Sequence, residues 1–329
     1  MKKKLFVLLF FLGFVQQAFS ASHAIVFVHI GRELPSYMET AIRQARLFNK
    51  ECPIYLVLNE EALSRFSEQS VDPSLLLVTC ESLHKTDEHR SFIRHSRLDK
   101  NWAGGFWNHA TERFFYLYDL ISEYHLENVF HLENDNMLYA DVQDLLPLFR
   151  EYYPGIGATF DNEERFIGGF VYIRNAPSLQ PLVTFLAAHA HEGRYEMQVI
   201  AQFKEESGRD QIDYLPIVMP EYVAANPLVS PAGHSARDPN LFCNRMEVFD
   251  SIFDAAALGQ YLGGIDPRNG PSVPGFINES CVFNPSLLTY EWQRDSEGRN
   301  VPYALYAGRK CRINNLHIHS KRLYEFYSK

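Results

Sequence analysis

The stretch AIVFVHIGRELPSYMETAIRQARLFNKECPIYLVLN, residues 24–59, decides the fold class of this chain. Its first seven residues form an apolar, β-branched run that ends at Gly31, and residues 53–59 form a second run of strand length. Between them, residues 36–50 carry apolar side chains at helical spacing. Two strands joined by one helix make a βαβ unit. We therefore expect parallel strands at the start of an α/β domain.

The same alternation continues along the chain. SLLLVTC (74–80) predicts a third strand, residues 106–126 a long helix with an apolar stripe, NVFHL (128–132) a fourth strand and FIGGFVYIRN (166–175) a fifth. This order is typical of an open, mostly parallel sheet that is flanked by helices. We predict one α/β domain over residues 22–225.

Near Pro216 the composition changes to loops rich in Pro and Gly with short elements between them. No internal repeat or low-complexity tract interrupts the sequence, so we interpret residues 226–329 as a loop-rich C-terminal extension that packs on the first part.

The N-terminus has the pattern of a targeting segment. MKKK is followed by the short apolar run LFVLLFFLGF and by small residues at Ala18 and Ser20, which is the order of a cleaved signal peptide over residues 1–20. The run is short for a membrane span. We expect a secreted or extracytoplasmic protein; the alternative is a signal anchor that keeps the chain on a membrane.

Charge and cysteine content exclude several classes of function. The formal net charge of -9 over 329 residues argues against a nucleic-acid partner, and any phosphate site must be local. The five cysteines show no CxxC spacing, so they predict neither a zinc site nor a complete disulfide framework. One or two disulfides would still leave one thiol over.

Two carboxylates follow the fourth predicted strand, in the segment HLENDNMLY (131–139). Ligands of open α/β sheets bind beyond the carboxyl ends of the strands, where Glu133 and Asp135 are expected. Oxygens at i and i+2 on such a turn can both reach Mg²⁺ or Mn²⁺, which share their remaining positions with substrate phosphates. The alternative is an acidic pair that only shapes the turn.

The segment LHIHSK (316–321) carries a second set of ligands. On an extended strand His317, His319 and Lys321 project from one face. Imidazoles bind metal ions, and an ammonium group beside them can neutralise a phosphate. The alternative is a buried histidine and a solvated lysine. Together with the acidic turn, the segment favours a shared cation site, to which the C-terminal extension contributes.

Three segments together resemble a glycosyltransferase of the GT-A fold. They are the acidic turn after a helix that carries Arg113, the strand FIGGFVYIRN, and the terminal LHIHSK. The resemblance runs from about Ile25 to Lys321, and the C-terminal HxHxK is similar to that of glycogenin-like members. Glu133 stands where the first Asp of a DxD motif is expected. The resemblance implies transfer of a sugar from a nucleotide-sugar, a UDP-sugar in particular, to a glycan, protein or lipid acceptor, with Mn²⁺ or Mg²⁺ as cofactor and with retention at the anomeric carbon.

The resemblance also implies roles for particular residues. His29, Ile30 and Gly31 would meet the base and ribose of the nucleotide, with Asn59 nearby, and Arg113 would assist at the phosphates.

Glu133 and Asp135 would hold the cation. His319 would complete its shell, with His317 as the alternative, and Lys321 would neutralise a phosphate oxygen.

Gly168 and Gly169 would let the backbone approach the donor sugar, the alternative being a bulge or bend inside the strand. Glu196 and Gln198, at an expected helix start, would face the reacting sugar.

The extension offers acceptor-side candidates. Asp254 and Gln260 lie on a predicted short helix, and Asp254 or Glu279 could act as the base of an inverting enzyme. Asp254 has an alternative role as a helix N-cap.

Two other classes of protein stay open. A non-catalytic carbohydrate- or nucleotide-binding module could use the same scaffold. A metal-dependent phosphohydrolase would also use carboxylates and histidines, although it normally needs more than two acidic ligands or a second metal ion.

Overall fold

The computed structural model describes residues 22–64, 66 and 72–329, and in this part of the chain the central sheet has seven strands. They lie in the order β3-β2-β1-β4-β7-β6-β8. Their bounds are β1 Ala24–His29, β2 Ile54–Leu58, β3 Leu76–Thr79, β4 Val129–Leu132, β6 Ile156–Asn162, β7 Arg165–Ile173 and β8 Ile212–Tyr214. Only β7 runs antiparallel to its neighbours in this sheet. The predicted open, mostly parallel α/β sheet is confirmed.

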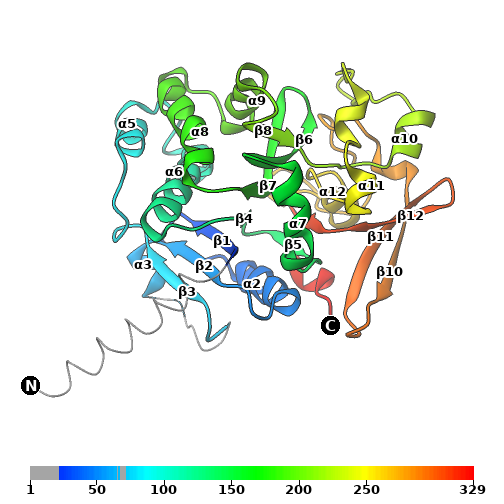
Figure 1. Ribbon diagram of the computed structural model, residues 1–329, viewed down its shortest axis with the longest axis horizontal. Helices are drawn as coiled ribbons and strands as arrows, with labels where there is room; N and C mark the ends of the chain where they lie inside the picture. The colour runs from blue at the N-terminus through cyan, green and yellow to red at the C-terminus, as the bar shows by residue number, and fades with distance from the viewer. Residues whose placement is uncertain (1–21, 65, 67–71) are drawn as a thin grey trace, which may run out of the picture.

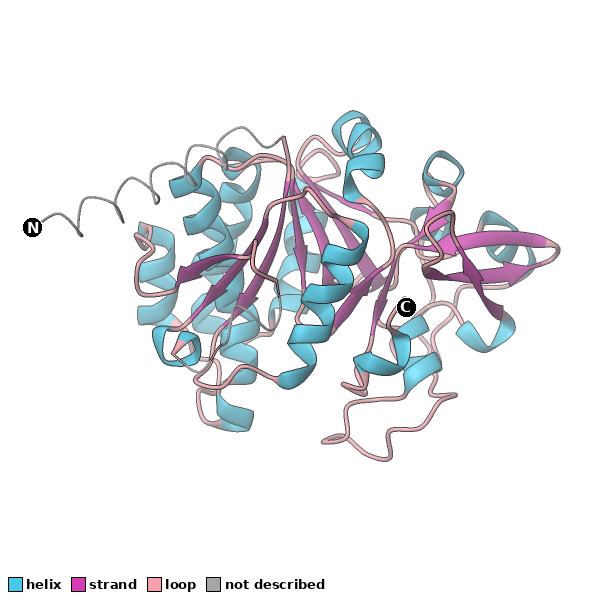
Figure 2. Ribbon diagram, turned by 90° about the horizontal axis from the view of Figure 1, so that it is seen from below, coloured by secondary structure: helices cyan, strands magenta, loops and turns pink. Residues whose placement is uncertain are grey.

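Helices lie on both faces of this sheet (Figures 1 and 2). The helices of the described chain are α2 Ser36–Phe48, α3 Glu60–Leu63, α5 Asp87–His95, α6 Phe106–Tyr124, α7 Val142–Tyr152, α8 Ala176–His189, α9 Glu196–Ser207, α10 Pro220–Ala225, α11 Met246–Phe249 and α12 Leu258–Gly263. Helices α5, α6, α8 and α9 pack against one another (Figure 1). In α2 the buried residues Met38, Ala41, Ile42 and Ala45 follow the expected helical spacing.

The strand order places a reversal point between β1 and β4. From β1 the chain moves outward through β2 and β3, and it then crosses back to add β4 on the other side of β1. At such a point the connections leave the sheet toward opposite faces, so a crevice opens at the carboxyl ends of the two strands. His29 ends β1, and Glu133 follows β4 directly.

The C-terminal part contains a second sheet that the sequence did not predict. Its strands lie in the order β10-β11-β12-β9, with bounds β9 Ser251–Ile252, β10 Thr289–Arg294, β11 Asn300–Tyr306 and β12 Arg309–Ile313. A separate pair joins β5 (Asn136–Leu138) to β13 (Asn315–His317). The expected loop-rich extension is thus a small sheet with loops around it, while the domain limit at residue 225 stays a prediction.

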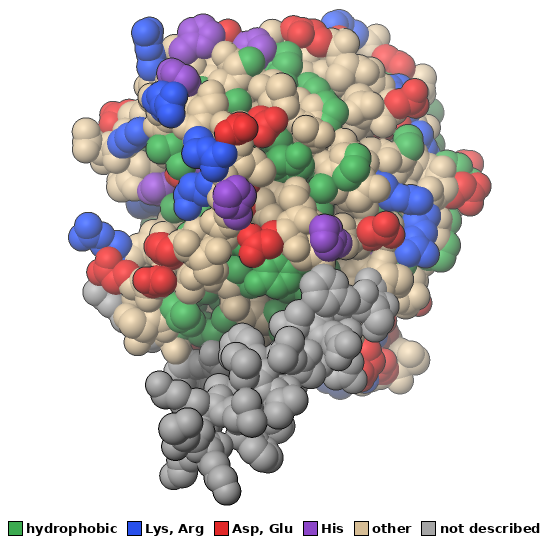
Figure 3. Space-filling view, turned by 60° about the vertical axis from the view of Figure 1, so that its left-hand side comes forward, with side chains coloured by type: hydrophobic (Ala, Val, Ile, Leu, Met, Phe, Trp, Pro, Cys, Tyr) green, Lys and Arg blue, Asp and Glu red, His purple; other side chains and the backbone are tan. Residues whose placement is uncertain are grey.

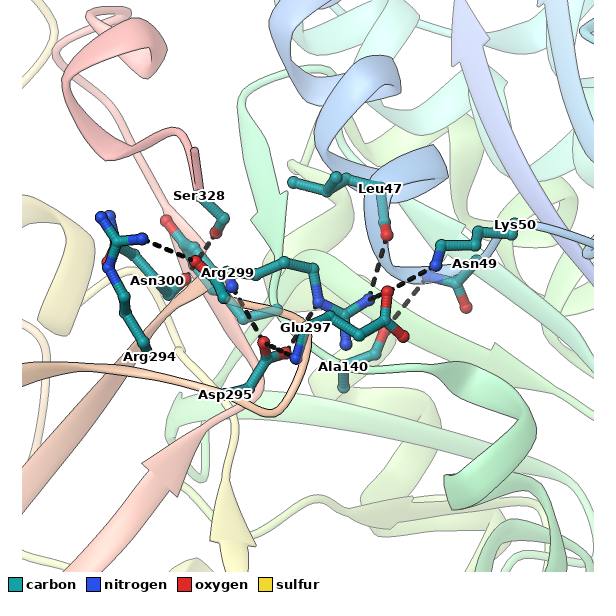
Figure 4. Close-up of polar contacts among 12 residues, drawn as sticks. Leu47, Asn49, Lys50, Ala140, Arg294, Asp295, Glu297, Arg299, Asn300 and Ser328 are labelled. Atoms are coloured by element: carbon teal, nitrogen blue, oxygen red, sulfur yellow. Dashed lines mark hydrogen bonds and ion pairs between the residues drawn. The ribbon is translucent and has the colours of Figure 1, made fainter.

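The β10–β11 hairpin rests on the C-terminal end of α2 (Figure 4). The guanidinium of Arg299 donates to the carbonyl oxygen of Leu47 at 3.0 Å and to Asp295 Oδ2 at 2.7 Å, within its own hairpin. Nearby, Lys50 Nζ lies 2.5 Å from Glu297 Oε2. These contacts join residues about 250 positions apart in sequence, and they hold the C-terminal part against the start of the chain.

The five cysteines are all free and buried, so the disulfides left open by the sequence do not form in this structure. The predicted signal peptide lies outside the described residues, and the proposed export stays a prediction. Among residues 22–64, 66 and 72–329, no helix has the length and apolar character needed to cross a membrane.

Candidate functional site

Pairing between β5 and β13 brings the two candidate segments together. His317 lies opposite Asn136 in this antiparallel pair, and Ile318 N–H donates to the carbonyl oxygen of Asp135 at 2.9 Å. The turn that carries Glu133 and Asp135 closes through a bond from Asn136 N–H to the carbonyl oxygen of Glu133 at 3.0 Å. The acidic turn and the histidine segment therefore share one edge, as the sequence predicted.

One carboxylate and two imidazoles converge there. Asp135, His317 and His319 each present a ligand atom, and these atoms all lie within 4.8 Å of one another. His317 Nε2 stands 3.1 Å from Asp135 Oδ1 and 2.8 Å from Glu133 Oε2. The two rings meet edge to face with centroids 4.3 Å apart. This is a compact O and N donor set of the kind that a small divalent cation needs.

Two cationic side chains flank the carboxylates. Lys321 Nζ pairs with Asp135 Oδ2, and the Arg113 guanidinium pairs with Glu133 Oε1. Lys321 does not continue the strand: its φ of 63° puts it in the left-handed region, and its N–H donates to the carbonyl oxygen of Ile318 at 3.1 Å. The prediction of an extended segment through Lys321 is wrong, because β13 ends at His317 and a turn swings the ammonium group back to the acidic residues.

The histidines have opposite protonation tendencies. Burial alone would lower the pKa of His317, but the charges of Asp135 and Glu133 raise that pKa to about 10. Burial and the neighbouring His317 lower the pKa of His319 to about 3. His319 is therefore neutral with a lone pair available, whereas His317 holds a proton between two carboxylates.

The same charges hold the acidic groups ionised. Burial opposes ionisation of Asp135, but Lys321 and His317 bring its pKa well below the ordinary value. Arg113 and His317 likewise lower the pKa of Glu133 against the effect of burial.

These residues fit a divalent cation. Asp135 is an ionised oxygen ligand, His319 is a neutral nitrogen ligand, and His317 presents Nε2 to both carboxylates. Asp135, His317 and His319 would hold the cation, and its binding would release the proton of His317, since metal binding releases protons from its ligands. Glu133 is less free than predicted, because Arg113 pairs with one of its oxygens.

Gln260 and Asp254, predicted as catalytic, lie behind the histidines. Gln260 Nε2 stands 2.6 Å from His319 Nδ1, and an amide turned to present Oε1 there would fix the tautomer whose Nε2 lone pair is free. Asp254 accepts from the N–H groups of Ala257, Leu258 and Gly259 at the start of α12, and from His317 N–H at 2.9 Å. Asp254 is not the N-cap residue itself, which is Ala257, but its side chain accepts from N–H groups at the helix start as a cap does. We regard both residues as positioning groups.

Gly168 and Gly169 make room for protein side chains. A Cβ on Gly168 would collide with the Arg113 guanidinium, and one on Gly169 would stand 2.8 Å from both His317 Nδ1 and Asn136 Nδ2. The pair also lies in a bulge, since Ile167 is opposite Thr159 while Val171 is opposite Ala158. The bulge alternative is therefore realised, and the close approach that the glycines permit is to Arg113 and His317.

Replacing Gly169 by alanine is expected to weaken Mn²⁺ binding by about tenfold or more, because the methyl group must displace the His317 ring. Isothermal titration calorimetry with MnCl₂ measures the change. Gly208→Ala is the matched control, since its φ of 80° is strained but an added Cβ meets nothing within 4 Å. Equal Mn²⁺ affinity in both variants would show that His317 is not held by this contact.

The residues predicted to meet the nucleotide lie along the neighbouring strand ends. Gly31 N–H donates to Asn59 Oδ1 at 2.8 Å, and Asn59 Nδ2 donates to Glu81 Oε1 at 3.0 Å. The imidazole of His29 contacts Asn134 of the acidic turn at 3.2 Å. Ile30 is half-buried against the core. This row connects the ends of β1, β2 and β3 to the candidate metal site.

Glu196 and Gln198 are separated by the helix that carries them. Glu196 begins α9 as a buried side chain 3.7 Å from Arg113 Nη2, and burial raises its pKa to about 7. Gln198 is exposed, because residues two apart on a helix point away from each other. The structure brings Glu196 to the cluster and leaves Gln198 in solvent.

Two polar residues of the site were missed by the sequence reading. Glu81 lies two residues after the end of β3 and also accepts from Glu60 N–H at 3.0 Å. Asn134 lies between the two predicted acidic residues. The rule that ligands bind beyond strand ends could have found Glu81, because it comes directly after an apolar run.

Comparison with known proteins gives remote structural similarity only. No family model and no curated protein matches the chain. Mouse xyloside xylosyltransferase 1 is similar with a TM-score of 0.45 and 10% identity, over 60% of this chain and 86% of that chain. The PaToxG glycosyltransferase is similar with a TM-score of 0.42 and 9% identity, over 62% and 78%. A cytidylyltransferase from Leptospira borgpetersenii also matches, with a TM-score of 0.37 and 11% identity over 59% and 76%. With scores this low, the chemistry of the site itself has to identify the function.

Proposed function

We propose that this protein is a metal-dependent glycosyltransferase that moves a sugar from a UDP-sugar to a hydroxyl group of a glycan, protein or lipid acceptor. The observation that carries the proposal is the meeting of Asp135, His317 and His319 at the reversal point of the sheet. A site built from two segments 186 positions apart, with a cation-binding donor set and a lysine at its rim, fits a diphosphate better than it fits a structural turn.

Glycosyl transfer needs the charge of the leaving group to be stabilised. The bond from the anomeric carbon to the diphosphate oxygen breaks, a bond to the acceptor oxygen forms, and the hydroxyl proton passes to the departing diphosphate. A bound Mn²⁺ or Mg²⁺ would supply Lewis-acid stabilisation of that diphosphate. Lys321, whose side chain is 25% exposed, has access to an incoming phosphate. Arg113 adds a second positive charge behind Glu133.

The row of residues at the ends of β1 to β3 suits a nucleoside. Asn59 and Glu81 offer amide and carboxylate groups of the kind that bind ribose hydroxyls, and the backbone of Gly31 lies beside them. We assign the base and ribose to this row, with the diphosphate directed toward Lys321.

Retention of configuration is part of the proposal. An inverting enzyme needs a free carboxylate base beside the acceptor. Asp254 is fully buried and its oxygens accept four backbone N–H groups, so of the two predicted bases only the exposed Glu279 could serve. A retaining reaction needs chiefly leaving-group assistance, which the cluster of Lys321, Arg113 and the cation ligands can give.

The test is metal-dependent hydrolysis of nucleotide-sugars in the absence of acceptor. We expect Mn²⁺ to support hydrolysis of at least one member of a panel of UDP-glucose, UDP-galactose, UDP-xylose, UDP-N-acetylglucosamine and GDP-mannose. EDTA should abolish it, and His319→Ala should lower the rate by about a hundredfold or more, because a ligand of the cation is lost.

The other classes of protein give different results. Binding of UDP with Mn²⁺ but no turnover of any donor would identify a binding module. Hydrolysis of p-nitrophenyl phosphate without hydrolysis of nucleotide-sugars would identify a phosphohydrolase. Either result would overturn the glycosyltransferase proposal.

A further inference from the structure

Four aromatic side chains form a platform beside the candidate site. We use this name for Trp102, Phe106, Trp107 and Tyr195. Trp102 is 52% exposed, and Phe106 and Tyr195 are each 41% exposed. Trp107 is partly buried and packs on the core, which anchors the group. Large rings are usually buried in a folded protein, so three exposed ones in a single cluster point to a binding surface.

The rings are arranged as a continuous surface. Trp107 stacks on Tyr195 with centroids 4.3 Å apart and on Trp102 at 6.1 Å with an interplanar angle of 10°. Phe106 meets the edge of Trp107 at 4.9 Å. The rings therefore fix one another without being covered. Such preorganisation lowers the entropy cost of binding a flat ligand.

A strained turn presents the platform. Ala103, Gly104 and Gly105 all have positive φ, at 48°, 69° and 84°, and the carboxylate of Asp99 accepts from Trp102 N–H at 3.1 Å. A non-glycine residue such as Ala103 takes this conformation at a cost, and such strain persists where the surrounding structure demands it. The turn lies just before α6, the helix that also carries Arg113.

The platform reaches the candidate metal site along two routes. On one side Tyr195 directly precedes Glu196, whose carboxylate lies 3.7 Å from Arg113.

On the other side Arg268 lies over the Phe106 ring at 5.6 Å and pairs with Asp266 at 2.7 Å. Asp266 Oδ2 is in turn 3.9 Å from Lys321 Nζ, which contacts Asp135. A ligand on the rings would therefore have a polar rim that leads to the cation ligands.

We propose that the aromatic platform binds the acceptor saccharide, so that the acceptor of this enzyme is a glycan. The inference rests on the proposed function, because it names the acceptor class of the same site. Sugar rings have flat apolar faces and polar edges, and they match exposed aromatic rings bordered by Arg268 and Asp266. Acidic and basic side chains are interspersed on the side of the molecule shown in Figure 3.

The test measures saccharide binding without any donor. Xylotriose, maltotriose and chitotriose are titrated into the full protein and followed by saturation-transfer NMR. We expect at least one to bind, and Trp102→Ala to weaken that binding by about tenfold or more, as for the removal of an aromatic anchor. Trp102→Phe should largely restore it. The control is Tyr324→Ala, which removes a side chain that is 70% exposed and outside the platform.

Each other result has a definite meaning. If none of the three saccharides binds, or if Trp102→Ala binds as tightly as the parent protein, the inference is wrong. Trp102-dependent binding to vesicles of phosphatidylcholine and phosphatidylglycerol, without saccharide binding, would also overturn it and make the platform a membrane surface. Nucleotide-sugar hydrolysis by the parent protein without saccharide binding would leave the proposed function standing. Saccharide binding in a protein that hydrolyses no donor would instead overturn the function and leave the platform as a lectin-like site.

Discussion

Replacing Asp135 by asparagine is expected to weaken Mn²⁺ binding by more than about a hundredfold and to remove metal-dependent donor hydrolysis. The substitution keeps the shape of the side chain and removes the charge that faces both His317 and Lys321. Isothermal titration calorimetry with MnCl₂ and the hydrolysis assay measure the two effects. The unfolding free energy should fall by about 1–3 kcal/mol, since the buried Lys321 and His317 lose a charged partner.

Asp144→Asn provides the control, because this carboxylate is exposed in the first turn of α7. It should bind Mn²⁺ like the parent protein. If Asp135→Asn lowered stability but kept Mn²⁺ affinity and turnover, the acidic turn would be structural and the cation proposal would fail.

The second large effect concerns stability and pH at Asp161. This residue of β6 is fully buried, and its Oδ1 has no hydrogen-bond partner in the described structure. Burial raises its pKa to about 7, although Arg165 at 3.3 Å and Asn278 at 3.5 Å work in the opposite direction. The folded protein therefore holds a proton on Asp161 at pH values where the unfolded chain has lost it.

The direction of the pH dependence of stability follows from proton uptake on folding. Between the unfolded pKa near 3.8 and the folded pKa near 7, the folded state binds more protons, so the contribution of Asp161 to stability falls as pH rises. Over the whole interval the loss is up to about 4 kcal/mol. The unfolding free energy of Asp161→Asn, relative to that of the parent protein, should therefore increase as pH rises from 4.5 to 8. Urea unfolding measures this difference. A stability difference that does not change with pH would mean that Asp161 is ionised in the folded state throughout.

The sequence predicted five of the seven strands of the central sheet, but not the direction of each strand. Residues 24–59 predicted the first βαβ unit because apolar periods of two and 3.6 residues mark strands and helices. Periodicity does not depend on chain direction, so β7 gave no sign of being antiparallel. The strands β6 and β8 were not predicted at all. In the C-terminal sheet, Pro302 lies inside β11, and a proline in a short run weakens the strand signal.

The candidate site was likewise predicted only in part from the sequence. The acidic turn and the HxHxK segment, nearly two hundred residues apart, predicted one shared site. The carboxylates of the first and the imidazoles of the second can together bind one cation. Details that depend on packing could not be predicted. The left-handed turn at Lys321 and the use of Gly168 and Gly169 to admit Arg113 and His317 depend on which side chains meet in space.

Because the site depends on the pairing of β13 with β5, it can form only late in synthesis, and it is sensitive to cleavage near the C-terminal segment. Only three residue pairs connect the two strands, yet His317 and Lys321 reach the acidic turn through them. During synthesis, the turn and the whole seven-stranded sheet leave the ribosome before residues 315–321 do. A nascent chain would therefore fold its sheet without being able to bind a cation. For the same reason, a protease that cuts the chain before residue 315 would remove His317, His319 and Lys321 from the site while most of the core stays intact.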